Sequence, residues 1–191
     1  LGKPGLAIPY LDQALVSKEP LTPLERRDAL SSQGYLYAEE GQYAQAAKAW
    51  SQSLALQPDP VIALDLAKMQ HCLGQFRESL ATLEAIETAK LPAALQIERL
   101  EEIAANFKME KQPAKALETL NQANQLKSTP DHNYQVGLIL KEEHRAQEAI
   151  PYLEKAVAAS PENNTSQVAL GSAYPDPKQY REAAPPCEQC T

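Results

Sequence analysis

The 191-residue sequence is poor in glycine and in aromatic residues, and it lacks the patterns of β-strands and membrane spans. Glycine occurs 7 times, aromatic residues make up 6% of the chain, and Trp occurs once. No stretch rich in Val, Ile and Thr alternates apolar with polar residues, so we predict no strand. No run of 18 apolar residues is present, so we predict no membrane-spanning helix. Ala, Leu, Gln, Glu and Lys are abundant instead, which favours an all-helical fold.

The charge balance argues against nucleic acid as the main ligand. The chain has 25 acidic side chains and 18 Lys and Arg, for a net charge of −7. Phosphate binding requires a basic field, which this composition does not supply. With 43% apolar and 23% charged residues, the chain can bury a core and is not typical of a disordered protein.

Residue patterns for catalysis, metals or cofactors are also missing. The three His residues, His71, His132 and His144, do not share the spacing of metal ligands with one another or with carboxylates. No GxxxxGK, GxGxxG or GxSxG string occurs, so nucleotide binding and serine hydrolase chemistry have no support. We therefore predict no catalytic residue, no metal site, no cofactor and no enzymatic activity.

Two short motifs that can mark metal, redox or glycosylation sites are better explained as structural features. Cys187 and Cys190 form a CxxC, but it lacks a second pair for zinc and the strand–helix context of a redox motif. We interpret both as packing residues, and Cys72 as an isolated thiol. Residues 163–166 contain overlapping glycosylation sequons, which we interpret as a turn between repeats.

One pattern recurs along the chain. Each copy is a short turn followed by a helix with a small residue, a large apolar residue four positions later and usually a small residue three positions beyond that. This spacing places all three on one helix face, where small residues permit close approach of a neighbouring helix. In chain order the positions are Ala46, Trp50 and Ser53; Ser79, Leu83 and Ile86; Ala116, Leu120 and Ala123; Ala149, Leu153 and Ala156; and Ala183, Cys187 and Cys190.

A partner helix precedes each turn and carries a small residue of its own. These small residues are 33, 37, 33 and 34 residues apart along the chain. The longer step implies about three extra residues near 90–92, in a longer helix or a longer turn. The small residues are Gly34, Ala67, Ala104, Gly137 and Gly171.

Capping residues support this division into helices. Thr22, Pro23 and Glu25 form an N-cap with a capping box. Gly41 and Gly74 lie where a helix end requires a left-handed residue. We predict helices over 3–18, 23–40, 43–56, 60–73, 76–89, 93–110, 113–127, 131–143, 146–159, 164–174 and 179–190.

The period near 34, with two helices per unit and Pro58, Pro130 and Pro161 closing three units, resembles the tetratricopeptide repeat family. The resemblance implies an all-α, right-handed superhelical solenoid of antiparallel helix pairs. It also implies a non-enzymatic scaffold for protein–protein interaction. We predict one solenoid over 1–191, with a trailing helix of a truncated repeat at 1–20, repeats at 27–60, 61–92, 93–130 and 131–163, and a partial, irregular repeat at 164–191, where prolines are frequent.

The resemblance also implies a binding surface. First helices line the concave groove in this family, and a protein or peptide segment binds beside the small packing residues. The two Tyr, two Leu and three Lys in this surface suit apolar contacts and some negative charge on the partner. The Lys/Asn/Arg clamp of chaperone-binding members is not reproduced. The predicted groove residues are Ser31, Tyr35, Leu64, Lys68, Glu98, Glu101, Ala105, Lys108, Tyr134, Leu138 and Lys141.

Two narrower interpretations remain open. Gln112-Pro113, the Asn163-Asn164 pair and Ala169-Leu170-Gly171 are similar to the repeat region of bacteriophage adsorption protein A and related exopolysaccharide-export porins. That likeness would imply a periplasmic domain, although unpaired thiols argue against this location, and the alternative is cytoplasmic. Alternatively, Tyr35 and Tyr134 would stack on a carbohydrate. Both chain ends look cut from a longer array, which would favour end-to-end self-association.

Overall fold

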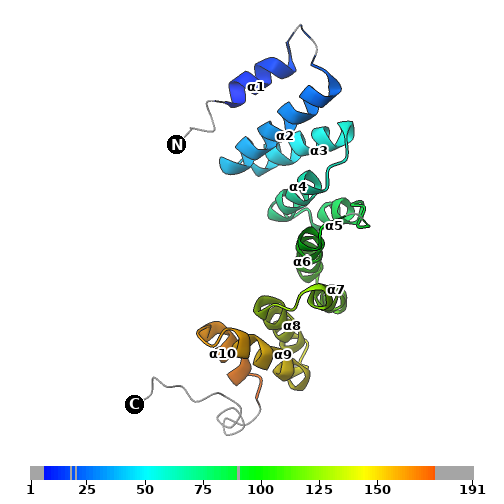
Figure 1. Ribbon diagram of the computed structural model, residues 1–191. Helices are drawn as coiled ribbons and strands as arrows, with labels where there is room; N and C mark the ends of the chain where they lie inside the picture. Colours follow the sequence, from blue (N-terminus) through cyan, green and yellow to red (C-terminus); the bar gives the residue numbers. More distant parts are fainter. Residues whose placement is uncertain (1–6, 18, 20, 90, 175–191) are drawn as a thin grey trace. The chain divides into compact units, whose positions relative to one another are not determined.

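The structure is a computed structural model that describes residues 7–17, 19, 21–89 and 91–174. Within these residues the chain forms ten helices and no strand (Figure 1), which confirms the predicted all-helical fold. The helices are α1 (Ile8–Leu15), α2 (Pro23–Glu39), α3 (Tyr43–Leu56), α4 (Pro60–Cys72), α5 (Phe76–Glu84), α6 (Ala93–Met109), α7 (Pro113–Leu126), α8 (Pro130–Glu142), α9 (Ala146–Ala159) and α10 (Asn164–Gly171).

Most helix ends fall within one residue of the prediction. The helices α3 and α9 begin and end at the predicted residues. The exceptions are α1 and α10, which end three residues early, and α5, which ends at Glu84 instead of residue 89. The helix α1 begins at Ile8, and its predicted start at residue 3 lies outside the described residues. The predicted helix over 179–190, with Cys187 and Cys190, lies outside the described residues.

The chain divides into two compact units, residues 1–111 and 112–191. In the first unit, α1 to α6 pack on their neighbours in chain order, and α4 also contacts α6. In the second unit, α8 packs on α7 and α9, and α10 contacts both α8 and α9. Each unit therefore consists of stacked helix pairs, in which every helix buries one face on its neighbours. A single solenoid over the whole chain stays a prediction.

The predicted packing pattern is present in the helix pairs. Ala46 and Ser53 are fully buried on either side of Trp50, and the indole ring lies so close to Gly34 that a methyl group there would overlap it. In the second unit a methyl group on Gly137 would lie 2.5 Å from Cγ and Cδ2 of Leu153. The small residues thus permit the close helix contact that the large residue fills.

The turns between paired helices share one backbone feature. Gly41 and Gly74 have φ angles of 72° and 74°, as predicted from their position at helix ends. Lys111, which follows α6, and His144, between α8 and α9, have φ angles of 55° and 59°. The left-handed backbone conformation therefore recurs in these turns. Lys111 and His144 adopt it at an energetic cost that glycine does not incur.

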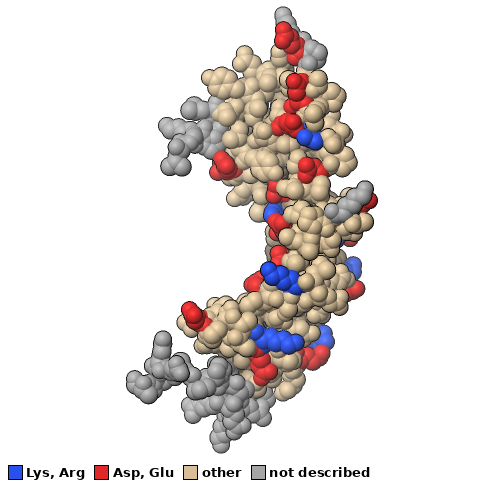
Figure 2. All heavy atoms as spheres, in the orientation of Figure 1, with Lys and Arg blue, Asp and Glu red and all other residues tan. Residues whose placement is uncertain are grey.

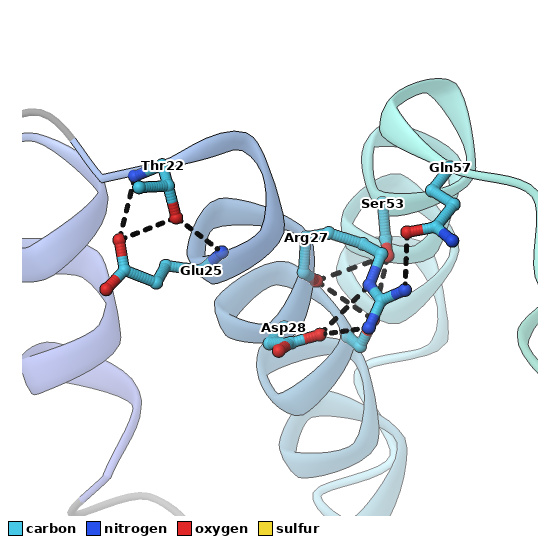
Figure 3. A network of polar contacts seen from close by, with 7 residues as sticks. Thr22, Glu25, Arg27, Asp28, Ser53 and Gln57 are labelled. Atoms are coloured by element: carbon cyan, nitrogen blue, oxygen red, sulfur yellow. Dashed lines mark hydrogen bonds and ion pairs between the residues drawn. The ribbon is translucent and has the colours of Figure 1, made fainter.

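The predicted capping box at the start of α2 is also present (Figure 3). The Thr22 backbone N–H donates to Glu25 Oε2 at 2.8 Å, and the Glu25 backbone N–H donates to Thr22 Oγ1 at 3.2 Å. These two bonds satisfy backbone donors that the first turn of a helix leaves unpaired. They fix the start of α2, the first helix of the pair that contains Trp50.

The helix α5 ends early, and a longer connection to α6 replaces its last turns. Ile86 occupies the position where the other second helices have a small residue, Ser53, Ala123 or Ala156. The Arg99 Nε–H donates to the Leu83 carbonyl at 2.6 Å and so satisfies a backbone group at the end of the helix. The distance from the start of α5 to the start of α6 nevertheless equals that from the start of α3 to the start of α4, so the longer connection only compensates for the shorter helix. The extra residues of the 37-residue step lie in α6, which has 17 residues where α4 and α8 have 13, and this decides for the longer helix.

Candidate functional site

The predicted groove residues of the first unit lie on α2, α4 and α6. Tyr35 on α2 remains 42% exposed. Its ring packs edge-on against Trp50, with centroids 5.1 Å apart. Its hydroxyl donates to Asp65 Oδ2 on α4 at 2.9 Å. Burial, and then the contact with Asp65, raise the pKa of Tyr35 to about 12. Tyr35 therefore connects the first helices of successive repeats and still presents part of its ring to solvent.

Lys68 connects α4 to α6. Its Nζ donates to Glu98 Oε1 at 2.5 Å and lies 3.9 Å from Asp65 Oδ1. Burial opposes its charge, but Glu98 and Asp65 outweigh that effect and raise the Lys68 pKa. Burial also raises the pKa of Asp65. Tyr35, Asp65, Lys68 and Glu98 thus form a polar row across three first helices, hereafter the first-helix row.

The remaining predicted residues of α6 lie beyond this row. Glu101 and Ala105 are partly buried, and Lys108 is exposed. Burial raises the pKa of the neighbouring Glu102 carboxyl. Glu102 was not among the predicted residues, although its position four residues after Glu98 places it on the same helix face.

A buried polar network lies next to the row, between α4, α5 and α6. Asn106 is fully buried, and its Nδ2 donates to Ser79 Oγ at 2.8 Å. Ser79 Oγ donates in turn to the Ala67 carbonyl at 2.8 Å, and His71 Nδ1 bonds Asn106 Oδ1 at 2.9 Å. Since these contacts satisfy buried polar groups and fix α6 against the α4–α5 pair, we interpret the network as structural.

Two of the predicted groove residues make contacts inside the first unit. Ser31 Oγ lies 2.7 Å from Ser53 Oγ and donates to the Arg27 carbonyl at 2.9 Å, at the α2–α3 interface. Leu64 exposes 2% of its surface, because its side chain lies in the core that contains Leu83 and Ile103. This burial removes Leu64 from the surface that a partner can contact.

The second unit has a smaller set of predicted residues, all on α8. Tyr134 and Leu138 are partly buried and keep some exposed surface. Lys141 Nζ donates to the Ala169 carbonyl at 3.2 Å and to Ser172 Oγ at 2.5 Å. A cation at this position offsets the partial negative charge of the α10 C-terminus. We call Tyr134, Leu138 and Lys141 the α8 patch.

The groove lysines were expected to attract negative charge on a partner, and the surroundings of Lys68 bear on this expectation. Lys68 is paired with two carboxylates, so it does not offer a free positive charge to a partner. On the face drawn in Figure 2, acidic surface is more extensive than basic surface over α2, α3 and α4. Lys68 therefore does not support the expectation of a negatively charged partner, which in this unit depends on the exposed Lys108.

Metal-binding side chains do not gather at one place in the described part of the chain. Among these residues, no group of three or more His, Cys, Asp and Glu could hold a metal ion. Cys72 is an exposed free thiol. No helix in the described ranges has both the length and the apolar character needed to cross a bilayer.

Comparison with known proteins identifies the repeat. The family model "Tetratricopeptide repeat" matches residues 133–163, which cover most of α8, the turn and all of α9. No curated protein matches the sequence. The predicted link with outer-membrane export and phage-adsorption proteins gains no support from these comparisons.

Solved structures with the same fold cover most of the chain. A MamA crystal structure has a TM-score of 0.73 at 20% identity, over 84% of this chain and 90% of that one. MamA from Desulfovibrio magneticus RS-1, residues 41 to the end, has a TM-score of 0.71 at 19% identity, over 85% and 89%. YrrB, described as a TPR protein with an unusual peptide-binding site, has a TM-score of 0.63 at 16% identity, over 96% and 87%. The chain therefore has the fold of tetratricopeptide-repeat solenoids, and the match at 133–163 supports that family.

Proposed function

We propose that this chain is a non-enzymatic scaffold that binds protein or peptide segments through the first helices of its tetratricopeptide repeats. The first-helix row carries the proposal. In it, side chains from three successive first helices are held in place by direct contacts 2.5–2.9 Å long, while Tyr35 stays 42% exposed. Such preorganisation reduces the conformational entropy that a partner must remove on binding. A partly exposed Tyr beside fixed polar groups is also a typical centre of binding energy.

The α8 patch supports the same function in the second unit. Tyr134 and Leu138 offer apolar surface one helical turn apart, and Lys141 follows on the same side. YrrB, which shares the fold, is itself described as having a peptide-binding site. We propose the first-helix row and the α8 patch as two contact surfaces, each within its own unit.

The test compares partner capture by the native chain with capture by two variants. The first-unit variant combines Tyr35→Ala with Lys108→Glu, and the α8 variant combines Tyr134→Ala with Lys141→Glu. Captured proteins are identified by mass spectrometry, and each purified candidate is then titrated calorimetrically. We expect affinity for a true partner to fall about tenfold or more in at least one variant.

Matched controls change the same residue types on second helices. Tyr43→Ala with Lys48→Glu alters α3, and Tyr152→Ala with Lys155→Glu alters α9. Both controls should stay within about twofold of the native affinity. Helical circular dichroism verifies that every variant folds. The proposal fails if captured partners bind the control and first-helix variants equally, or if the purified native chain binds none of them.

A further inference from the structure

The first unit contains a cavity away from the first-helix row. It has a volume of about 760 Å³ and lies between α3, α4, α5 and the connection that follows α5. Ala63, Leu66, Ile86 and Leu91 form buried apolar walls, and Leu54 is half-buried beside them. This volume falls within the range of about 300–1,000 Å³ that is typical of ligand pockets.

The cavity is associated with the irregular second helix. Whereas α3, α7 and α9 each have 14 residues, α5 has 9. The connection after it contributes Ala85, Ile86, Glu87 and Leu91 to the cavity lining. The regular repeats place the last turns of a helix at this point of the chain. The segment that replaces the last turns of α5 therefore shapes this pocket.

The pocket and the first-helix row use opposite faces of α4. Ala63, Leu66 and Gln70 line the pocket at intervals of three and four residues, which places them on one side of the helix. Asp65 and Lys68 follow Ala63 and Leu66 by two residues each, which is a rotation of about 200° around the axis. A ligand in the pocket would therefore not compete directly with one on the row.

The polar groups around the pocket indicate what it would bind. Two of its lining residues are carboxylates, Asp59 and Glu87, and none of the described lining residues is Lys, Arg or His. Asp59 Oδ1 accepts the backbone N–H groups of Val61 and Ile62 and so caps α4, whereas Glu87 is exposed at the edge. Thr82 Oγ1 donates to Gln70 Oε1 at 2.8 Å and holds one wall in place.

We propose that this pocket is a second binding site, for a peptide segment that carries bulky apolar side chains next to Lys or Arg. The buried walls match the apolar side chains, and Asp59 and Glu87 match the cation by charge complementarity. This site stands independently of the first-helix row, so either can be correct without the other.

The test uses a defined pair of synthetic peptides. One is an eight-residue peptide in which pairs of Leu alternate with Lys, acetylated and amidated at its ends. The other has Glu in place of each Lys. Calorimetry should show that the native chain binds the Lys peptide at least about tenfold more tightly than the Glu peptide. Methyl NMR signals of Leu54, Leu66, Ile86 and Leu91 should shift on binding.

Two variants at exposed positions test the pocket without removing core contacts. Ala85→Trp places a large ring in the cavity, and Glu87→Lys reverses the charge at its edge. We expect each to weaken binding of the Lys peptide about tenfold. Ala158→Trp and Glu118→Lys make the same substitutions at exposed positions of the second unit and should stay within about twofold.

The outcomes separate this site from the first-helix row. If the Lys peptide binds the Tyr35→Ala, Lys108→Glu variant normally and fails to bind Ala85→Trp, the pocket is the site. If the reverse holds, the peptide uses the first-helix row and the pocket proposal is wrong. Equal binding of both peptides, no binding of either, or unchanged binding to Ala85→Trp would also overturn it.

Discussion

The α8–α9 pair and the α4–α5 pair show how one repeat sequence produces two kinds of packing. In α9, Ala149, Leu153 and Ala156 are all fully buried, and the helix continues to Ala159. In α5, Ser79 and Leu83 are equally buried, but Ile86 replaces the second small residue and the helix ends at Glu84. The connection that replaces the last turns of α5 borders a cavity of about 760 Å³.

We infer from this difference that the second small residue controls how far the two helices stay in contact. A small side chain there permits close approach to the end of the helix, whereas a β-branched side chain needs space. The first half of the motif is unchanged between the two pairs, so the helices still dock. Only the last turns differ, which is where the structure places the pocket.

The largest expected effect concerns the central large residue of each pair. Leu153→Ala should lower the free energy of unfolding by about 3–5 kcal/mol, and Leu83→Ala by about 2–3 kcal/mol, although both side chains are fully buried. The smaller loss is expected at Leu83 because residues beside the cavity can relax into the vacated space. Urea unfolding measures the loss in unfolding free energy, and hydrogen exchange shows whether the loss falls on α5 or on α9.

Leu126→Ala serves as the control for this comparison. Leu126 is 48% exposed at the end of α7, so its truncation should change stability by about 0.5 kcal/mol or less. Equal losses at Leu83 and Leu153 would show that the cavity gives the irregular pair no freedom to relax.

Exchanging the second small residue tests its role directly. Ala156→Ile gives α9 the residue type that stands at the equivalent position, Ile86, just after α5. We expect a loss of about 1–3 kcal/mol from overpacking. We also expect hydrogen-exchange protection to be lost in the last turn of α9. Ala158→Ile, at an exposed position in the same turn, should preserve both the stability and the hydrogen-exchange protection of α9. Full protection of α9 in the Ala156→Ile variant would mean that other residues end α5.

A smaller effect concerns the turns of the two pairs. Gly74 supplies the left-handed residue between α4 and α5, and His144 supplies it between α8 and α9. His144→Gly should raise the unfolding free energy by about 0.5–1 kcal/mol, since the relief of left-handed strain exceeds the entropy cost of glycine. Urea unfolding measures the change, and Gly74→Ala should lower stability by a similar amount. A destabilised His144→Gly variant would contradict this account.

The sequence predicted the helix-pair packing because that packing depends on residue size at fixed intervals. Gly34 and Gly137 were identified as close-approach positions, and the structure places Trp50 and Leu153 against them. The left-handed conformation of His144 was not anticipated, because only glycine indicates it in sequence. The early end of α5 was not predicted, and the place of the extra residues was left open, since an altered spacing does not distinguish a longer turn from a longer helix.

The site was less predictable than the fold. The contact between Tyr35 and Asp65 joins residues 30 positions apart, so it depends on how repeats stack and on side-chain rotamers. Leu64 was transferred from the family pattern, whereas its own surroundings in this chain are the apolar residues of the core. The pocket beside Ile86 could not be foreseen, because it requires the path of the connection after α5.

The smallest expected effect concerns the contact that links α4 to the preceding repeat. The folded state raises the Tyr35 pKa from 10.0 to about 12, so it holds the phenol proton more tightly than the unfolded chain does. The unfolding free energy should therefore fall as the pH rises through this range. Because Tyr35 is 42% exposed, solvent screening limits this contribution to about 1 kcal/mol or less.

Tyr35→Phe isolates this contribution. The variant should lose about 0.5–1 kcal/mol at neutral pH, where the hydrogen bond to Asp65 is missing. Between about pH 9 and pH 11 it should then lose less stability than the native chain, because it lacks the titrating hydroxyl. Urea unfolding followed by Trp50 fluorescence reports on this region, since Trp50 contacts the Tyr35 ring. Tyr43→Phe, on α3 and 41% exposed, is the matched control for the loss of a partly exposed phenol hydroxyl. If Tyr35→Phe also shows the native pH dependence, the hydroxyl of Tyr35 does not link the two repeats.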